Sequence, residues 1–143
     1  MVILRKARSE DSDLLQAWRN DEATRRNSLN SETIPADEHA RWLDRSLGNT
    51  DRILFIVEDA GTPVGTVRID SLPDGRKELS WTIAPEFRGT GIGKQAVKKA
   101  IDEHPDWVFV ARIKGTNTAS IKIAEHAGYW FQREENGVLL FST

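Results

Sequence analysis

The chain has 143 residues, a formal net charge of −2, 38% hydrophobic residues and no cysteine. This length suits one domain with a proper core, and the charge argues against a general nucleic-acid binder, which would carry a basic excess. The lack of cysteine excludes a disulfide framework, a Cys-based metal site and a cysteine nucleophile; no other metal site is expected. The apolar run 2–4 before Arg5 is too short for a signal sequence or a membrane span, so a cytoplasmic chain without membrane contact is expected.

The first third of the chain predicts one strand and two helices. The strand is expected over residues 2–6, and the first helix follows it with an apolar face formed by Leu14, Leu15 and Trp18. The polar stretch 20–31 predicts a loop. A second helix begins near Pro35 and ends at Gly48. Its inward positions, spaced i, i+3, i+4 and i+8, are His39, Trp42, Leu43 and Leu47.

The remainder predicts a sheet with two more helices. Three strand-like runs are separated by Gly/Pro turns and should be antiparallel neighbours; they cover residues 53–58, 64–70 and 78–84. The later elements are a helix over 91–104, a strand over 107–113, a helix after Asn117 and a hairpin around Asn136-Gly137. Trp107 and Trp130 are expected in the core. The order β-α-α-β-β-β-α-β-α-β-β predicts one mixed α/β (α+β) domain over residues 1–143.

The most informative segment joins the strand ending at Ala84 to the next helix. Its sequence is Arg88-Gly89-Thr90-Gly91-Ile92-Gly93-Lys94. A helix start offers free N–H groups and a partial positive charge, and glycines let an anion approach them. Arg88 and Lys94 add positive charge on both sides. The segment therefore predicts a pyrophosphate-binding loop.

Three kinds of phosphate loop are distinguished by spacing. A Walker A loop would need Gly in place of Arg88 and Ser or Thr in place of Gln95, and a dinucleotide fingerprint would need its third glycine at Lys94. The pattern Arg-x-x-Gly-x-Gly instead resembles the coenzyme A loop of the GCN5-related N-acetyltransferase (GNAT) superfamily. A second segment, Asn117-x-x-Ser120 followed by Gly128-Tyr129, is similar to another motif of the same superfamily.

The resemblance implies a GNAT fold in which the strands before and after the loop helix are parallel and splay apart. It implies acetyl-CoA as cofactor, with the pantetheine arm in that gap, and a small-molecule amine as the partner; a homodimer is one option for the assembly. The cofactor-binding positions it assigns are Trp81, Thr82, Ile83, Arg88, Gly89, Thr90, Gly91, Ile92, Gly93, Lys94, Asn117 and Ser120.

For catalysis, direct attack of the amine on the thioester is expected, because no residue is a convincing acetyl acceptor. The resemblance implies that a backbone N–H near Ile83 polarises the carbonyl. Glu78 is the leading candidate for the base and Ser80 for holding water or the amine; alternatively Glu78 is a solvated glutamate paired with Arg76 or Lys77. The family's usual acid, a tyrosine, is replaced here by Ala124, and Tyr129 is expected to pack in the core.

The acceptor positions come from a finer resemblance. Trp18-x-Asn20 and His39-x-x-Trp42 resemble a pattern of acetyltransferases that act on nucleotide-linked amino sugars, and Arg25 would meet the diphosphate. Two alternatives remain open: a protein N-terminal acetyltransferase of the ribosomal-protein type, and a catalytically silent acyl-CoA-binding sensor.

Overall fold

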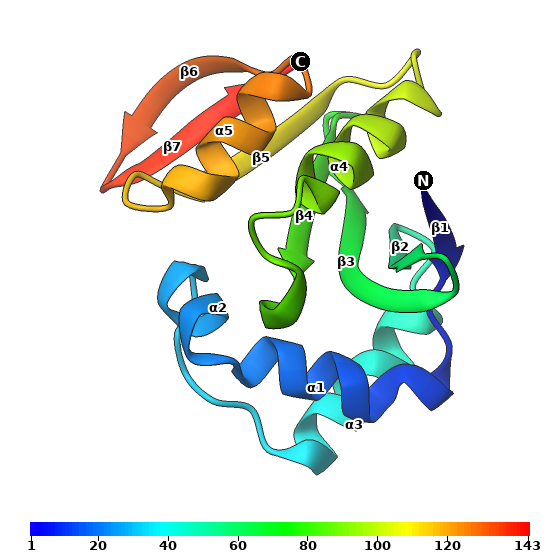
Figure 1. The fold of residues 1–143 in the computed structure, drawn as a ribbon. Helices are drawn as coiled ribbons and strands as arrows, with labels where there is room; N and C mark the ends of the chain where they lie inside the picture. The colour runs from blue at the N-terminus through cyan, green and yellow to red at the C-terminus, as the bar shows by residue number, and fades with distance from the viewer.

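The computed structural model describes residues 1–143 and contains one seven-stranded sheet and five α-helices (Figure 1). Short 3₁₀ turns lie at Ser9–Asp11 and Pro85–Phe87. The other elements, in chain order, are β1 (Val2–Lys6), α1 (Ser12–Asn20), α2 (Glu22–Asn27), α3 (Ala36–Leu47), β2 (Arg52–Asp59), β3 (Thr62–Ser71), β4 (Lys77–Ile83), α4 (Ile92–Asp102), β5 (Phe109–Lys114), α5 (Thr118–His126), β6 (Trp130–Glu135) and β7 (Val138–Ser142). No helix is long and apolar enough to cross a membrane.

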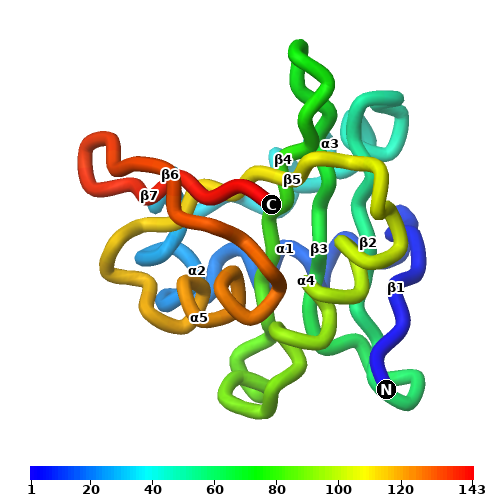
Figure 2. The backbone as a smooth tube through the Cα atoms, turned by 90° about the horizontal axis from the view of Figure 1, so that it is seen from above, coloured from blue at the N-terminus to red at the C-terminus, as the bar shows by residue number.

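The sheet has the strand order β1-β2-β3-β4-β5-β7-β6 and is antiparallel except for the β4–β5 pair. That parallel pairing covers only two positions, Lys77 with Phe109 and Glu78 with Val110. Beyond Glu78 the two strands diverge, and Figure 2 shows β5 running off at a wide angle from β4. The expected mixed sheet with a splayed parallel pair is therefore confirmed.

Two apolar clusters cover opposite faces of the sheet, as the alternation of β2 requires. Leu54 and Ile56 face the cluster under α1 and α3, whereas Val57 faces the larger cluster under α4 and α5. In α4 the buried positions recur at helical spacing: Ile92, Gly93, Ala96, Val97 and Ala100. No other strand lies between the divergent ends of β4 and β5.

One segment departs from the sequence-based expectation. Residues 22–27, predicted as loop, form α2, and none of its residues is buried. Because it lacks an apolar face, hydrophobic periodicity gave no signal for it. Its local signal is the cap: Asp21 accepts a hydrogen bond from the Thr24 N–H at 3.1 Å.

Trp130 was also predicted wrongly, since it is 74% exposed rather than in the core. Tyr129 takes the buried position just before β6, and all six residues of this edge strand, Trp130 included, are exposed. The predicted hairpin between β6 and β7 is confirmed. Asn136 and Gly137 have φ values of 52° and 79°, as a tight turn with two left-handed residues requires.

Candidate active site

The glycine-rich loop turns into α4 at Gly91, which caps the helix with φ +84°. A side chain rarely adopts this backbone conformation, so glycine is required for the turn itself. No atom lies within 4 Å of a Cβ built at Gly91, which leaves open space in front of the first N–H groups of α4. The loop is braced by the Thr90 hydroxyl, which donates to the Phe87 carbonyl at 2.5 Å.

Gly93 has a different reason to be glycine. A Cβ there would lie 2.6 Å from Ile123 Cδ1 and 3.3 Å from Ile83 Cγ1. The missing side chain therefore lets α4 pack closely against both α5 and the end of β4. This packing holds the helix start, the strand end and α5 around one cavity.

A cavity of about 420 Å³ lies between β4, the start of α4, α5 and α2. Eleven of the twelve predicted cofactor positions line it; only Thr90 does not. Positions that sequence analysis missed also line it: Ala23, Thr24, Asn27, Ser28, Phe87, Ala119, Lys122 and Ile123. We call this the cofactor cavity.

The edge of β4 inside the cofactor cavity offers free backbone groups. The Lys77 N–H donates to the Val108 carbonyl at 2.9 Å, on the edge of β4 that faces β5. Because strand N–H groups alternate, those of Trp81 and Ile83 point to the same side, where pairing with β5 has ended. An extended arm can bond there as an additional strand would.

Two motif residues fix the opposite wall. The Asn117 side chain caps α5 by accepting from the Ser120 N–H at 3.2 Å, as its position before the helix predicts. Ser120 Oγ in turn accepts from the Trp81 indole N–H at 3.2 Å. This bond joins α5 to β4 across the splayed region, so Trp81, Asn117 and Ser120 come together as expected.

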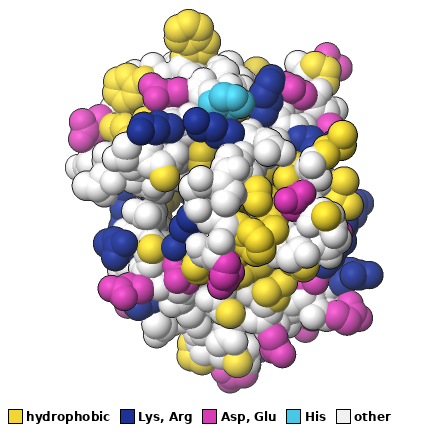
Figure 3. Space-filling view, viewed as in Figure 1, with side chains coloured by type: hydrophobic (Ala, Val, Ile, Leu, Met, Phe, Trp, Pro, Cys, Tyr) yellow, Lys and Arg dark blue, Asp and Glu magenta, His cyan; other side chains and the backbone are white.

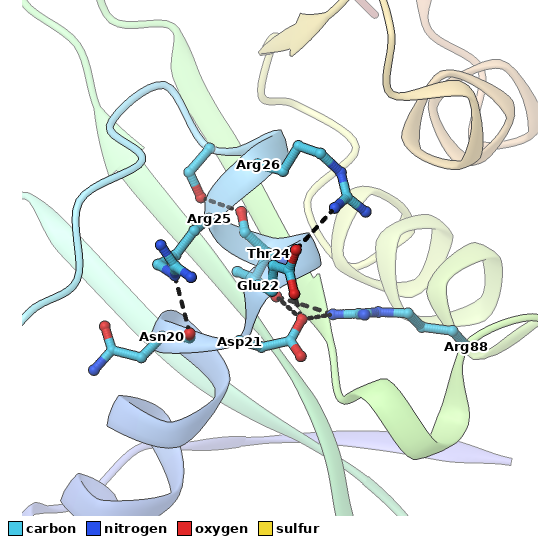
Figure 4. A network of polar contacts seen from close by, with 8 residues as sticks. Asn20, Asp21, Glu22, Thr24, Arg25, Arg26 and Arg88 are labelled. Atoms are coloured by element: carbon cyan, nitrogen blue, oxygen red, sulfur yellow. Dashed lines mark hydrogen bonds and ion pairs between the residues drawn. The ribbon is translucent and has the colours of Figure 1, made fainter.

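Helix α2 forms a third wall and is attached to the loop by Arg88 (Figure 4). Arg88 Nη2 donates to Asp21 Oδ2 at 2.8 Å and to Thr24 Oγ1 at 2.9 Å. These contacts hold the pKa of the Asp21 carboxyl below its usual value, with the Arg88 hydrogen bond as the main cause. Nε and Nη1 of Arg88 make no side-chain bond and remain available to a phosphate.

Further positive charge for phosphates comes from Lys94 and Lys122, which line the cofactor cavity without a carboxylate partner. Lys98 and Lys99 are instead occupied by Asp102 and Glu103, one turn along α4. In the space-filling view of this face, basic side chains gather over the α5 region (Figure 3). The cofactor cavity therefore combines a helix start, a free strand edge and several cations.

A second cavity, of about 340 Å³, lies on the other face of the sheet, and we call it the acceptor cavity. Its floor is made by facing residues of neighbouring strands, because Arg68 pairs with Ser80 and Thr66 with Thr82. The remaining lining residues come from α1, the following loop, α3 and strands β2 and β4: Leu15, Trp18, Arg19, Asn30, Ile34, His39, Trp42, Leu54 and Trp81. Trp81 and Thr82 line both cavities, so the two meet at the end of β4.

Of the five predicted acceptor residues, Trp18, His39 and Trp42 line the acceptor cavity. Asn20 does not; its amide bonds the Ile34 backbone on both sides, at 2.8 Å each. Arg25 does not either, and its Nε donates to the Asn20 carbonyl at 3.1 Å. Both residues hold the loop that precedes α3.

His39 is 2% exposed and its Nδ1 has no hydrogen-bond partner. Burial lowers the pKa of His39, with the charge of Arg19 acting in the same direction. The imidazole is therefore neutral at pH 7. Its ring lies 5.2 Å from that of Trp42, measured between centroids.

The candidate catalytic residues separate in the structure. Ser80 lines the acceptor cavity, and Ile83 lines the cofactor cavity. Glu78 lines neither, and its Oε2 accepts from Arg112 Nε at 2.5 Å, not from Arg76 or Lys77. Its role as a base stays a prediction.

No proton donor replaces the family's tyrosine on α5. Ala124 is fully buried and carries no proton to give. Tyr129 is 5% exposed and its hydroxyl donates to the Val110 carbonyl at 3.5 Å. Burial, and then the charge of Glu78, raises the pKa of this phenol well above its usual value. Tyr129 therefore packs in the core, as expected.

The comparisons with known proteins agree with this geometry. Residues 1–130 match the family model of the acetyltransferase (GNAT) domain. A Bacillus licheniformis protein, described as the uncharacterized N-acetyltransferase p20, is 29% identical over 144 residues, covering 93% of this chain and 80% of that protein.

Solved structures share the fold at lower identity. The spermidine N-acetyltransferase of Vibrio cholerae, in complex with CoA and spermine, superposes with a TM-score of 0.86 at 16% identity, over 99% of this chain and 92% of that one. The ribosomal-protein-alanine N-acetyltransferase of Brucella melitensis gives 0.79 at 23% identity, over 99% and 98%.

The chain belongs to the GNAT acetyltransferase family. It is an acetyl-CoA-dependent N-acetyltransferase, and the residues around the cofactor cavity fit that cofactor: an open helix start for pyrophosphate and an unpaired strand edge for the pantetheine arm.

Proposed function

We propose that this enzyme acetylates the primary amine of a nucleotide-linked amino sugar by direct attack in a ternary complex. The observation that carries the proposal is the meeting of the two cavities at Trp81 and Thr82. These neighbours point to opposite faces of β4, so a donor on one face and an acceptor on the other come together at the strand end. Holding both reactants in this way supplies much of the rate enhancement.

The chain's own residues have defined tasks in this proposal. Bound acetyl-CoA would supply a thioester: the amine nitrogen bonds to its carbonyl carbon, the C–S bond breaks, and CoA leaves as the thiol with the proton that the amine releases, carried by water. The Ile83 N–H, on the free side of β4, donates to the oxygen that gains negative charge. Ser80 and Thr82, on the acceptor side of the strand, orient the amine through their hydroxyl groups. The amine must lose its proton before attack, and the positive lining of the acceptor cavity favours the neutral form.

The lining of the acceptor cavity supports a sugar over a polycation. Trp18 and Trp42 offer apolar surface to a sugar ring, and the lining contains two arginines but no aspartate or glutamate. A polyamine or an aminoglycoside carries several positive charges and would need carboxylates there. We therefore place amino sugars first, with peptide N-termini as the second candidate.

A thiol-release assay tests this proposal. Acetyl-CoA is incubated with a UDP-linked 4-amino sugar, spermidine, an aminoglycoside and peptides with free N-termini. We expect turnover with the amino sugar, reduced in Trp42→Ala while acetyl-CoA affinity is unchanged. Robust transfer to peptide N-termini with none to amino sugars would reverse the ranking. Tight acetyl-CoA binding without turnover on any amine would favour the silent sensor.

A further inference from the structure

The acceptor cavity contains a guanidinium group without a counter-ion. Arg19 Nη2 donates to the Asn30 carbonyl at 2.8 Å, but Nη1 is buried with no partner, and no carboxylate forms an ion pair with this side chain. Burial, and then the like charge of nearby Arg25, lowers the pKa of Arg19. A partly buried arginine in such surroundings is costly unless an anion reaches it.

Two more unpaired polar atoms lie in the walls of the same cavity. Arg68 Nε lies 2.9 Å from Asp70 Oδ2 and forms an ion pair with it. The two atoms are not aligned for a hydrogen bond, so Nε has no hydrogen-bond partner. Asp70 is shared with Arg52, whose Nε lies 2.6 Å from Oδ1, so one carboxylate serves two arginines. His39 Nδ1 is the third such atom, in a side chain that is 98% buried. The three residues whose buried side-chain nitrogens lack a hydrogen-bond partner all line this cavity.

We infer that Arg19, assisted by Arg68, binds an anionic group, a phosphate or a carboxylate, carried by the acceptor amine. This inference deepens the proposed function and rests on it for the identity of the amine. It replaces Arg25 as the anchor of the diphosphate, because Arg25 lies outside the cavity lining and bonds the Asn20 carbonyl. A guanidinium suits this task, since its planar fork matches two oxygens of a phosphate or carboxylate.

The binding test uses UDP as the probe, titrated calorimetrically into protein saturated with CoA. Saturation keeps the UDP diphosphate away from the glycine-rich loop. We expect Arg19→Gln to weaken UDP binding about tenfold or more. The matched control is Arg41→Gln on α3, an exposed arginine that pairs with Asp37 at 3.5 Å and lies outside the cavity; its affinity should equal that of the wild type.

Arg19→Lys and Arg68→Gln accompany this series in case Arg19→Gln fails to fold, which CoA affinity and a melting curve report. Arg19→Lys keeps the charge but not the fork, so it should bind UDP between the wild type and Arg19→Gln. Arg25→Gln decides between the two arginines. A loss of UDP affinity in Arg25→Gln, with none in the Arg19 variants, overturns the inference.

The turnover test compares a UDP-linked 4-amino sugar, the same sugar without its nucleotide, and a free amino acid. We expect kcat/KM to fall about tenfold or more when the nucleotide is removed, and Arg19→Gln to abolish that difference. A preference for the amino acid that depends on Arg19 identifies a carboxylate as the anion instead. Equal rates on charged and uncharged amines, unaffected by Arg19→Gln, overturn the anion anchor but leave acetyl transfer intact. UDP binding through Arg19 without any turnover overturns the proposed function and leaves the anion anchor.

Discussion

Single residues of β4 have different tasks although they share one face of the strand. Glu78 and Ser80 are two positions apart, yet Glu78 is bound by Arg112 while Ser80 opens into the acceptor cavity. The sequence favoured Glu78 as the base because it begins the strand that carries the pantetheine arm. The alternative is a deprotonation that depends on the positive cavity lining and on water.

Two variants distinguish Glu78 as the general base from deprotonation through water. Glu78→Gln removes the charge that pairs with Arg112 and should lower the melting temperature while keeping kcat within about threefold of the wild type. Ser80→Ala should lower kcat/KM for the amine and leave acetyl-CoA affinity unchanged. Steady-state kinetics measure both. A fall in kcat of about a hundredfold in Glu78→Gln, with unchanged acetyl-CoA affinity, would restore Glu78 as the general base.

Asp11 is a residue whose task is stability. Its buried carboxylate accepts from Arg5 Nη1 at 2.9 Å, from Arg5 Nη2 at 2.8 Å and from the Arg8 N–H at 2.8 Å. The Arg5 hydrogen bonds are the main reason that the pKa of Asp11 lies below its usual value. This contact joins β1 to the turn that precedes α1.

Asp11→Asn should lower the free energy of unfolding at pH 7 by about 2 kcal/mol, since one partner of a buried ion pair loses its charge. Because the folded pKa is depressed, the stabilisation is present above the unfolded value and is lost as the pH falls through the folded value. Urea unfolding at a series of pH values should therefore show the difference between wild type and variant shrinking below about pH 4. A difference that is constant down to pH 2 would contradict this account.

At the scale of elements, α2 is a wall of the cofactor cavity that is held in place by contacts with other elements. It has no buried residue, and its position depends on Arg88 from the glycine-rich loop and on Lys114, which donates to the Arg26 carbonyl at 2.9 Å. Arg88 itself lines the cofactor cavity. We therefore expect the order of α2 and cofactor binding to be coupled.

Asp21→Ala removes both the cap of α2 and the partner of Arg88. We expect amide exchange in residues 22–27 to accelerate and CoA affinity to fall about fivefold, since a cap contributes about 1 kcal/mol. Glu22→Ala is the control, because that exposed carboxylate lies 3.9 Å from Arg26 and does not contact Arg88. Unchanged exchange in residues 22–27 of Asp21→Ala would show that α2 is held by other means.

The start of α4 gives a second test at this scale. Gly91→Val should weaken CoA binding by about tenfold or more, because a branched side chain resists φ +84° and projects toward the phosphate site. Gly75→Val is the matched control: Gly75 has φ +89° and equally open surroundings, but lies in the turn before β4, away from the cofactor cavity. Calorimetry of both variants should show the loss only in Gly91→Val. Equal affinities would contradict the loop assignment.

How much could be predicted from sequence depended on the kind of signal. Apolar periodicity and turn residues identified every strand and four of the five α-helices. The resemblance carried by the loop motif and the Asn117 motif identified eleven cofactor-lining positions. Helix α2 was missed because it is a short polar helix held by contacts with distant residues. Arg19 and Arg68 were missed for a related reason: only the register of β3 with β4 and the packing of α1 bring them into one cavity.

At the scale of the whole molecule, the divergence of β4 from β5 determines where chemistry can occur. This divergence leaves one edge of β4 without a paired strand. The cofactor cavity lies beside that edge on one face of the sheet, and the acceptor cavity lies on the other face. The cofactor cavity is basic at its phosphate end, and the acceptor cavity holds two arginines and no carboxylate. The proposed reaction therefore joins two ligands that both carry negative charge.

The central claim is that both ligands are bound at once and that the acetyl group passes directly between them. Initial rates of thiol release, measured over a grid of acetyl-CoA and UDP-linked 4-amino sugar concentrations, test it most directly. The account predicts intersecting double-reciprocal lines, as a ternary complex requires. Parallel lines, or an acetylated form of the protein isolated before the amine is added, would contradict it.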